Sequence, residues 1–180
     1  MSSSPRSESG QQKVFWLWLL LSSFGYGSQP AAAMPENLFP PQKPAFIPEM
    51  AYDLQIGSAT VYMEASGEPP EGQRAVVWVL VNRLRDGRWG PSLASVCLYP
   101  EQFSAWNTND PNRGRLAQAA DTDPTLQQIT QYLQNALDGT DTDPTGGALY
   151  YFAPALAMPS WASKFTKLID IGNQSYYTDK

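Results

Sequence analysis

Three glutamates lie within one short segment of the chain: Glu64, Glu68 and Glu71. A carboxyl group can donate a proton to a leaving group or accept one from a nucleophile, so each is a candidate general acid or base. The same three residues also fit a solvated acidic turn, because most acidic side chains lie on protein surfaces. Other features of the sequence are needed to separate these two interpretations.

The residue types that the chain lacks narrow its chemistry. It contains no histidine and one cysteine, Cys97. Without histidine there is no Ser-His-Asp triad, no Cys-His pair and none of the usual histidine-containing zinc sites. A single cysteine allows neither an intrachain disulfide nor a paired-cysteine metal site. We therefore expect no metal and no cofactor, and carboxylate acid–base chemistry if the protein is an enzyme.

The net charge of the chain bears on its partners. It is −5 over 180 residues, and no cluster of Lys and Arg offsets it. Binding to nucleic acid depends on such clusters, so we expect no nucleic acid as a partner. The length is sufficient for one domain with a hydrophobic core and an additional tail.

The first 48 residues are typical of a leader followed by a linker. Basic residues precede eight apolar residues from Val14 to Leu21, and three alanines end at Ala33. This order predicts a secretory signal peptide over residues 1–33, cleaved after Ala33, and an exported protein of the periplasm or cell envelope. An uncleaved membrane segment is the alternative, and it would be the chain's only membrane contact. Residues 34–48 contain five prolines and predict an extended linker.

The folded domain is expected over residues 49–180. Apolar or small residues recur at helical spacing from Ala51 to Ala65, and Gly67 and Pro69 end the predicted helix. Glu64 then lies in the last helical turn, where the negative end of the helix dipole disfavours ionisation. Such a position suits a carboxyl group that must be protonated to act as an acid.

The remaining pattern is mostly helical. A very apolar helix is predicted over residues 71–85, a short one after Ser92, and a third from Asp123-Pro124 to Gly139. Residues 148–152 are rich in β-formers, and Gly172-Asn173 lies between two further β-rich segments, which indicates a hairpin. We expect an α+β fold, mainly α, with a small antiparallel β element near the C-terminus.

A series of motifs in order gives this sequence a family resemblance. They are Tyr62-x-Glu64-Ala-x-Gly-Glu-Pro-x-Glu-Gly-Gln73, Asn82-Arg83, Gln102-Phe-Ser104, Asp143-Pro-Thr-Gly-Gly-Ala-Leu-Tyr-Tyr-Phe152, Pro159-x-Trp161, and Ile171-Gly-Asn173 with Tyr177. Together they resemble the SleB/CwlJ family of cell wall hydrolases over residues 50–178. The resemblance implies a lysozyme-like, lytic-transglycosylase-like domain that cleaves peptidoglycan between N-acetylmuramic acid and N-acetylglucosamine.

The resemblance also implies roles for particular residues. It makes Glu64 the catalytic acid and base, with Glu68 and Glu71 as supporting acids. A lytic transglycosylase needs one such acid, whereas a muramidase usually needs a second carboxylate close by, for which Glu101 and Asp110 are candidates. The candidate substrate-binding residues are Tyr62, Gln102, Ser104, Trp106, Tyr150, Tyr151, Phe152 and Asn173. For each aromatic residue among them, packing in the core is the alternative.

The sequence departs from the family pattern at one position near its C-terminal end. The family often has Gly-Asn-His where this chain has Gly172-Asn173-Gln174. Gln keeps a donor and an acceptor but does not titrate near neutral pH.

The alternatives to an enzyme are a non-catalytic peptidoglycan-binding module and an exported envelope or virion accessory protein. A phage-encoded lysis protein (an endolysin) is a further alternative, and we expect a monomer.

Overall fold

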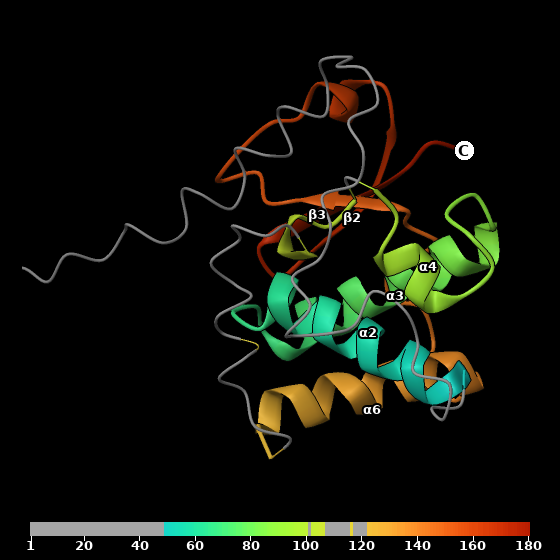
Figure 1. Cartoon of the computed structure of the whole chain (residues 1–180). Helices are drawn as coiled ribbons and strands as arrows, with labels where there is room; N and C mark the ends of the chain where they lie inside the picture. The colour runs from blue at the N-terminus through green and yellow to red at the C-terminus, as the bar shows by residue number, and fades with distance from the viewer. Residues whose placement is uncertain (1–48, 101, 107–115, 117–121) are drawn as a thin grey trace, which may run out of the picture.

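The computed structural model describes residues 49–100, 102–106, 116 and 122–180 (Figure 1). The predicted leader, the predicted linker, Glu101 and Asp110 lie outside these residues. No helix among the described residues has both the length and the apolar character needed to cross a membrane.

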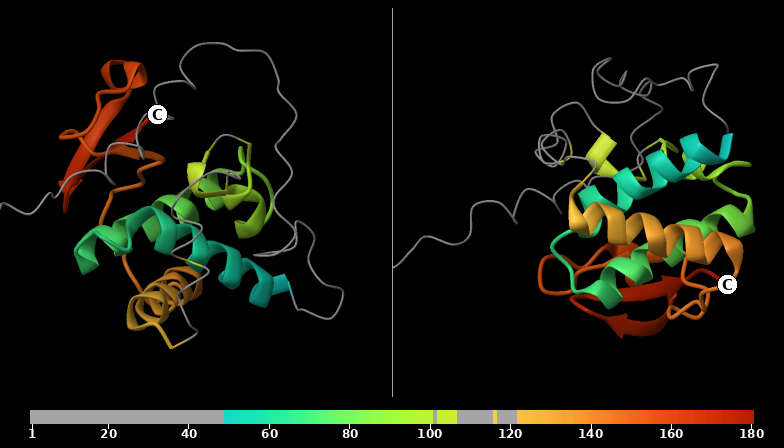
Figure 2. Two further views of the ribbon diagram at one scale, coloured as in Figure 1. Left: turned by 60° about the vertical axis from the view of Figure 1, so that its left-hand side comes forward. Right: turned by 90° about the horizontal axis from the view of Figure 1, so that it is seen from below.

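Three longer helices form the main layer of the domain. They are α2 (Glu49–Ala65), α3 (Pro70–Asp86) and α6 (Pro124–Asp138). A short turn joins α2 to α3, and α6 packs alongside both of them (Figure 1, Figure 2). The helical layer therefore places the end of α2 next to the beginning of α3.

The helix ends follow the capping chemistry that the sequence predicts. Asp123 caps α6 by accepting hydrogen bonds from the backbone N–H groups of Thr125 (2.9 Å) and Leu126 (3.0 Å). Gly87 and Gly139 end α3 and α6 with φ angles of +82° and +73°, a conformation that glycine adopts without strain. These predicted boundaries are confirmed.

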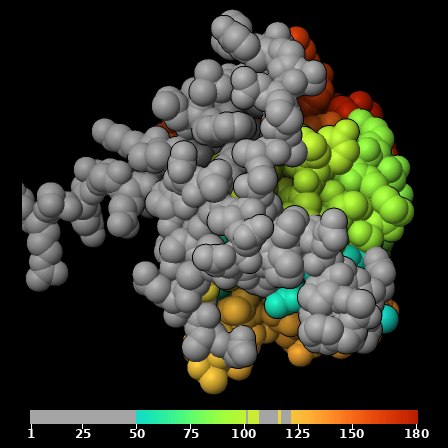
Figure 3. Space-filling model, in the orientation of Figure 1, coloured from blue at the N-terminus to red at the C-terminus, as the bar shows by residue number. Residues whose placement is uncertain are grey.

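The short helix α4 (Leu93–Cys97) is held by α2 as well as by its own cap. Ser92 accepts a hydrogen bond from the N–H of Ser95 at 3.1 Å, as the sequence predicts. In addition, the Asp53 carboxylate of α2 accepts from the N–H groups of Leu93 and Ala94 at 3.1 and 3.0 Å. In Figure 3, the green region that contains α4 lies between the C-terminal sheet and the lower helices, and most of the side chains of α4 are buried beneath it.

A three-stranded antiparallel sheet covers the other side of α3. Its strands are β1 (Tyr150–Phe152), β2 (Thr166–Ile171) and β3 (Gln174–Thr178), in the order β1-β3-β2. The turn between β2 and β3 is Gly172-Asn173, so the predicted hairpin and the predicted β element are confirmed.

The two faces of the sheet differ in what they contact. Tyr151 pairs with Tyr176 across β1 and β3, and both side chains join the helical core. Phe152 and Tyr177 face the other way, where Trp161 covers them in a second apolar cluster. The cause is the alternation of side chains along a strand.

The loop between α6 and β1 is tied to α3 by two carboxylates. Asp141 accepts hydrogen bonds from Arg74 Nε at 2.7 Å and from Trp78 Nε1 at 2.9 Å. Asp143 accepts from Asn82 Nδ2 at 2.9 Å and from the N–H of Gly147 at 2.8 Å. These contacts fix the path of the chain into β1.

We predict that Asp141→Asn makes the fold less stable at neutral pH by about 1–2 kcal/mol. The hydrogen bond from Arg74 is the main cause that lowers the pKa of Asp141 to about 2, from an ordinary 3.8. A pKa that is lowered by folding adds stability above the ordinary value, and that stability is lost as the pH falls toward about 2. The difference between wild type and variant in the free energy of unfolding should therefore shrink with acidification. Urea titrations at about pH 7 and about pH 3 measure this difference.

Asp138→Asn is the control for that measurement, because Asp138 is exposed at the end of α6. It should leave the free energy of unfolding nearly unchanged at both pH values. A deficit of Asp141→Asn that is the same at both pH values would contradict the role of the ionised carboxylate.

Candidate active site

Glu64 lies in the last turn of α2, as the sequence predicts, and is half-buried. Its Oε2 atom accepts a hydrogen bond from the hydroxyl group of Tyr151 on β1, at an oxygen–oxygen distance of 3.5 Å. This distance is at the upper limit for such a bond. The fold thus brings one predicted substrate-binding residue, Tyr151, onto the predicted acid.

The Tyr151 hydroxyl keeps its proton at every working pH. Burial raises the pKa of Tyr151 well above 10, and the negative charge of Glu64 raises it further, while Arg83 lowers it. A protonated phenol is a hydrogen-bond donor. Tyr151 therefore orients the Glu64 carboxyl group through a donor that does not titrate.

Tyr176 supports Tyr151 from β3. The two rings stack with their centroids 5.9 Å apart. The Tyr176 hydroxyl lies 2.9 Å from Gln174 Oε1 and 3.5 Å from the carbonyl oxygen of Gly72. Gln174, which stands where the family pattern has histidine, is 3% exposed and acts as a buried acceptor for Tyr176.

Glu68 joins the turn after α2 to the β2–β3 hairpin. Its Oε2 atom accepts hydrogen bonds from the backbone N–H of Asn173 at 3.0 Å and from the Asn173 side-chain amide at 3.3 Å. Glu71 lies apart from this contact, exposed in the first turn of α3, where the helix dipole favours a negative charge. Of the predicted site residues, Glu68 and Asn173 are thus brought together in a clamp between two turns.

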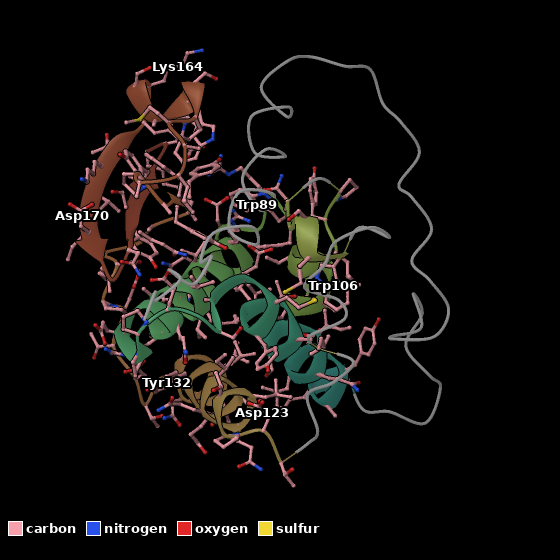
Figure 4. All side chains as sticks on the ribbon, turned by 90° about the vertical axis from the view of Figure 1, so that its left-hand side faces the viewer. Trp89, Trp106, Asp123, Tyr132, Lys164 and Asp170 are labelled. Atoms are coloured by element: carbon pink, nitrogen blue, oxygen red, sulfur yellow. The ribbon has the colours of Figure 1, made fainter. Side chains whose placement is uncertain are left out.

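Tyr62 and Trp106 are each bound to a neighbour inside the domain. The Tyr62 hydroxyl donates to Asp123 Oδ2 at 3.2 Å, and the Trp106 indole N–H donates to Thr60 Oγ1 at 3.0 Å. Both side chains are 8% exposed. Figure 4 shows Trp106 and Asp123 on opposite sides of α2. These contacts favour the packing alternative for both aromatic residues.

Gln102 and Ser104 flank the buried Phe103 and remain half-exposed. Ser104 begins a short 3₁₀ helix, η1 (Ser104–Trp106). Gln102 and Ser104 stay candidates for polar contact with a sugar.

Tyr150 and Phe152 lie on the face of the sheet opposite to Tyr151. Tyr150 packs against Phe165 with ring centroids 4.7 Å apart. Phe152 packs against Tyr177 at 5.3 Å and against Trp161 at 5.6 Å. The alternation of the strand therefore separates Tyr151, which reaches Glu64, from its two aromatic neighbours.

Arg83 occurs in the sequence only within the Asn82-Arg83 motif, and the sequence predicted no role for its side chain. Its side chain is 5% exposed, and Nε donates to the carbonyl oxygen of Leu149 at 2.8 Å. In the sequence, Arg83 could have been noticed as a charged residue that closely follows the apolar run of α3, next to Asn82.

Within the described ranges, no three carboxylate or thiol groups lie close enough to share a metal ion.

Comparison with known proteins gives one family match. The family model described as Cell Wall Hydrolase matches residues 67–177, a segment that begins three residues after Glu64.

The curated relatives are spore cortex-lytic enzymes. The enzyme of Oceanobacillus iheyensis is 32% identical over 125 residues, which are 69% of this chain and 41% of that protein. The enzyme of Bacillus subtilis is 34% identical over 110 residues, which are 61% of this chain and 32% of that protein. This chain thus spans less than half the length of these relatives.

Two solved structures resemble the fold. The catalytic domain of the germination-specific lytic transglycosylase SleB from Bacillus anthracis has a TM-score of 0.57 and 28% identity, covering 76% of this chain and 100% of that chain. The catalytic domain of the Bacillus cereus SleB protein has a TM-score of 0.56 and 28% identity, covering 70% of this chain and 89% of that chain.

We predict that Gly172→Ala disrupts the clamp between Glu68 and the hairpin. A Cβ atom at Gly172 would lie 2.8 Å from Glu68 Oε2, at a φ angle of +60°. The φ angle alone costs about 1–2 kcal/mol for a residue with a side chain, and the contact adds to that cost. Thermal or urea unfolding measures the sum.

Gly146→Ala is the matched control. Gly146 also has a positive φ angle, +69°, but a Cβ atom there would meet no atom within 4 Å. Gly172→Ala should therefore destabilise the fold more than Gly146→Ala does. Equal losses would show that the contact with Glu68 contributes nothing.

Proposed function

The chain belongs to the cell wall hydrolase family, and we propose that it cleaves peptidoglycan at the bond between N-acetylmuramic acid and N-acetylglucosamine, with Glu64 as the catalytic acid. The observation that carries this proposal is the hydrogen bond from Tyr151 to Glu64 at the end of α2. The likeness to the SleB lytic transglycosylase domain supports the choice of substrate and bond.

The reaction begins with the protonated Glu64 carboxyl group. It gives its proton to the glycosidic oxygen while the bond from that oxygen to C1 of N-acetylmuramic acid breaks. Positive charge then develops at C1 and the ring oxygen. Tyr151 keeps the carboxyl group in one orientation during this transfer, because its hydroxyl donates to Oε2.

The second step uses the carboxylate that the first step leaves. Glu64 takes the proton from the 6-hydroxyl group of the same muramic acid, and that oxygen bonds to C1. The products are a 1,6-anhydro ring and a new N-acetylglucosamine end, and Glu64 is again protonated. One carboxyl group thus suffices as acid and then as base.

Among the residues that the structure describes, which do not include Glu101 and Asp110, the placement of the neighbouring acids supports a mechanism with one carboxyl group. A muramidase would need a second carboxylate about 5–9.5 Å from the first. Glu68 is engaged by Asn173 in the clamp, and Glu71 is exposed on α3. In this role Glu68 positions the turn after α2, and Glu71 makes no contribution to the chemistry.

The setting of the reaction follows from the substrate. Peptidoglycan lies in the cell envelope, so the predicted signal peptide over residues 1–33 would deliver the domain to its substrate. The chain then acts as an exported enzyme of the periplasm or envelope, as a monomer, and without a cofactor.

We predict that Glu64→Gln lowers the initial rate of turbidity loss on purified peptidoglycan by about 10²–10⁴-fold. Gln has nearly the same shape and still accepts from Tyr151, but it has no acidic proton to give. The midpoint of thermal unfolding should therefore change little.

Glu71→Gln is the parallel variant. Because Glu71 is exposed on α3, we expect it to keep most of the activity. Full activity of Glu64→Gln would contradict the assignment of Glu64 as the catalytic acid. Retained binding to peptidoglycan by a wild-type protein that releases no fragments would indicate a non-catalytic binding module instead.

A further inference from the structure

Arg83 carries a positive charge in the interior of the domain. Its side chain is 5% exposed, and burial of a charge is costly unless nearby groups compensate for it. Its Nε atom donates to the carbonyl oxygen of Leu149, but Nη1 is buried and has no hydrogen-bond partner among the described residues. A buried charge with an unpaired donor calls for a physical explanation.

Aromatic rings surround the guanidinium group. Its central carbon lies 5.1 Å from the ring centroid of Trp89, 5.3 Å from that of Phe103 and 5.7 Å from that of Tyr150. Figure 4 shows Trp89 between the sheet and α4. Ring faces attract a cation and hold it in place. The position of the charge is therefore fixed.

The titratable groups that interact with this charge are all weak acids. They are Tyr151 and Tyr150 on β1, Cys97 on α4 and Glu64 on α2. Burial lowers the pKa of Arg83 and these acids raise it, and an arginine remains protonated throughout.

Three of these four acids keep their protons at neutral pH. Burial raises the pKa of Cys97 to about 12. Burial also raises the pKa values of Tyr150 and Tyr151 above 10. A glutamic acid ordinarily ionises near pH 4. Glu64 is therefore the one of the four whose negative charge, once it has given up its proton, can interact with Arg83.

We propose that Arg83 is a positioning residue for Glu64: it fixes β1 so that Tyr151 reaches the carboxyl group, and its buried charge stabilises the carboxylate that proton transfer leaves behind. The inference rests on the proposed catalytic role of Glu64. Arg83 acts through Glu64 and not on the sugar, because its side chain is buried.

The first part of this role is geometric. Leu149 lies two residues before Tyr151, and its carbonyl oxygen receives the Arg83 hydrogen bond at 2.8 Å. The same residue donates its own N–H to the carbonyl oxygen of Tyr177 at 2.9 Å. Leu149 is thus held by both α3 and β3, which sets the start of β1 and the direction in which Tyr151 points.

The second part is electrostatic. When Glu64 gives its proton to the glycosidic oxygen, a negative charge forms in a half-buried site. Tyr151 on β1 and Arg83 on α3 both interact with that charge, and Tyr176 on β3 stands behind Tyr151. Tyr151 supplies a dipole, whereas Arg83 supplies a full opposite charge. Such a charge favours the ionised form of a neighbouring carboxyl group.

The test compares Arg83→Met with wild type by the pH profile of turbidity loss on peptidoglycan. The rate falls on the alkaline side as Glu64 loses its proton. Without the positive charge, Glu64 ionises at higher pH, so this alkaline limb should move upward by about one pH unit or more. The maximal rate should fall at least about tenfold, since the carboxylate formed in the reaction is less stable.

Arg85→Met is the matched control for the loss of an arginine. Arg85 lies on the same helix, is exposed, and stacks on the Trp78 ring at 5.0 Å. Its variant should keep the alkaline limb and the maximal rate of wild type. An Arg83→Met profile that coincides with the Arg85→Met profile would overturn the inference.

Arg83→Lys separates the geometric part of the role of Arg83 from the electrostatic part. It also provides a test of the proposal if Arg83→Met does not fold. Lysine keeps the charge but lacks the planar group that reaches Leu149. The alkaline limb should stay within about half a unit of wild type, while the maximal rate falls several-fold. An unchanged maximal rate would overturn the positioning role. Circular dichroism confirms that each variant is folded.

The outcome for Glu64→Gln keeps this inference distinct from the function on which it rests. If Glu64→Gln is active, the proposed function fails and the Arg83 inference fails with it. If Glu64→Gln is inactive and the alkaline limb of Arg83→Met does not move, the Arg83 inference alone fails.

Discussion

The hydrogen bond between Tyr151 and Glu64 joins two parts of the chain that are 87 residues apart. It exists only if α2 ends at the correct residue and if β1 presents Tyr151 toward the helices. The first condition is met by the turn after Ala65, and the second by the path of the loop that Asp141 and Asp143 tie to α3. Much of the structure around the sheet serves to keep these two ends together.

The sheet contributes a second layer of support behind this contact. Tyr176 stacks on Tyr151, and Gln174 accepts from the Tyr176 hydroxyl in the interior. An uncharged amide suits that place, because it offers an acceptor without a charge that burial would penalise. Gln174, which the resemblance places where histidine often stands, therefore has a structural explanation: it accepts a hydrogen bond from the Tyr176 hydroxyl and holds that ring in place.

Local chemistry made the element boundaries predictable from the sequence. Gly87, Gly139, the Asp123-Pro124 start and the Gly172-Asn173 turn each act on their own neighbours in the chain, so a short segment is enough to recognise them. The position of Glu64 in a last helical turn followed from the same signals. These features needed no knowledge of the tertiary structure.

The contacts that select among the candidate residues were not predictable in this way. Tyr150, Tyr151 and Phe152 look alike in sequence, and only the register of β1 against β3 decides that Tyr151 alone of the three faces Glu64. The clamp between Glu68 and Asn173 and the hydrogen bond from Arg83 to Leu149 each join distant segments. Such pairings depend on how the layers pack, which local patterns do not encode.

The account depends on one carboxyl group that acts first as acid and then as base. Mass spectrometry of the soluble fragments released from purified peptidoglycan tests this most directly, because the chemical end of each fragment records which nucleophile attacked C1. We predict fragments that end in 1,6-anhydro-N-acetylmuramic acid. Fragments with reducing N-acetylmuramic acid ends would contradict the account, since water would then be the nucleophile and a second catalytic group would be needed.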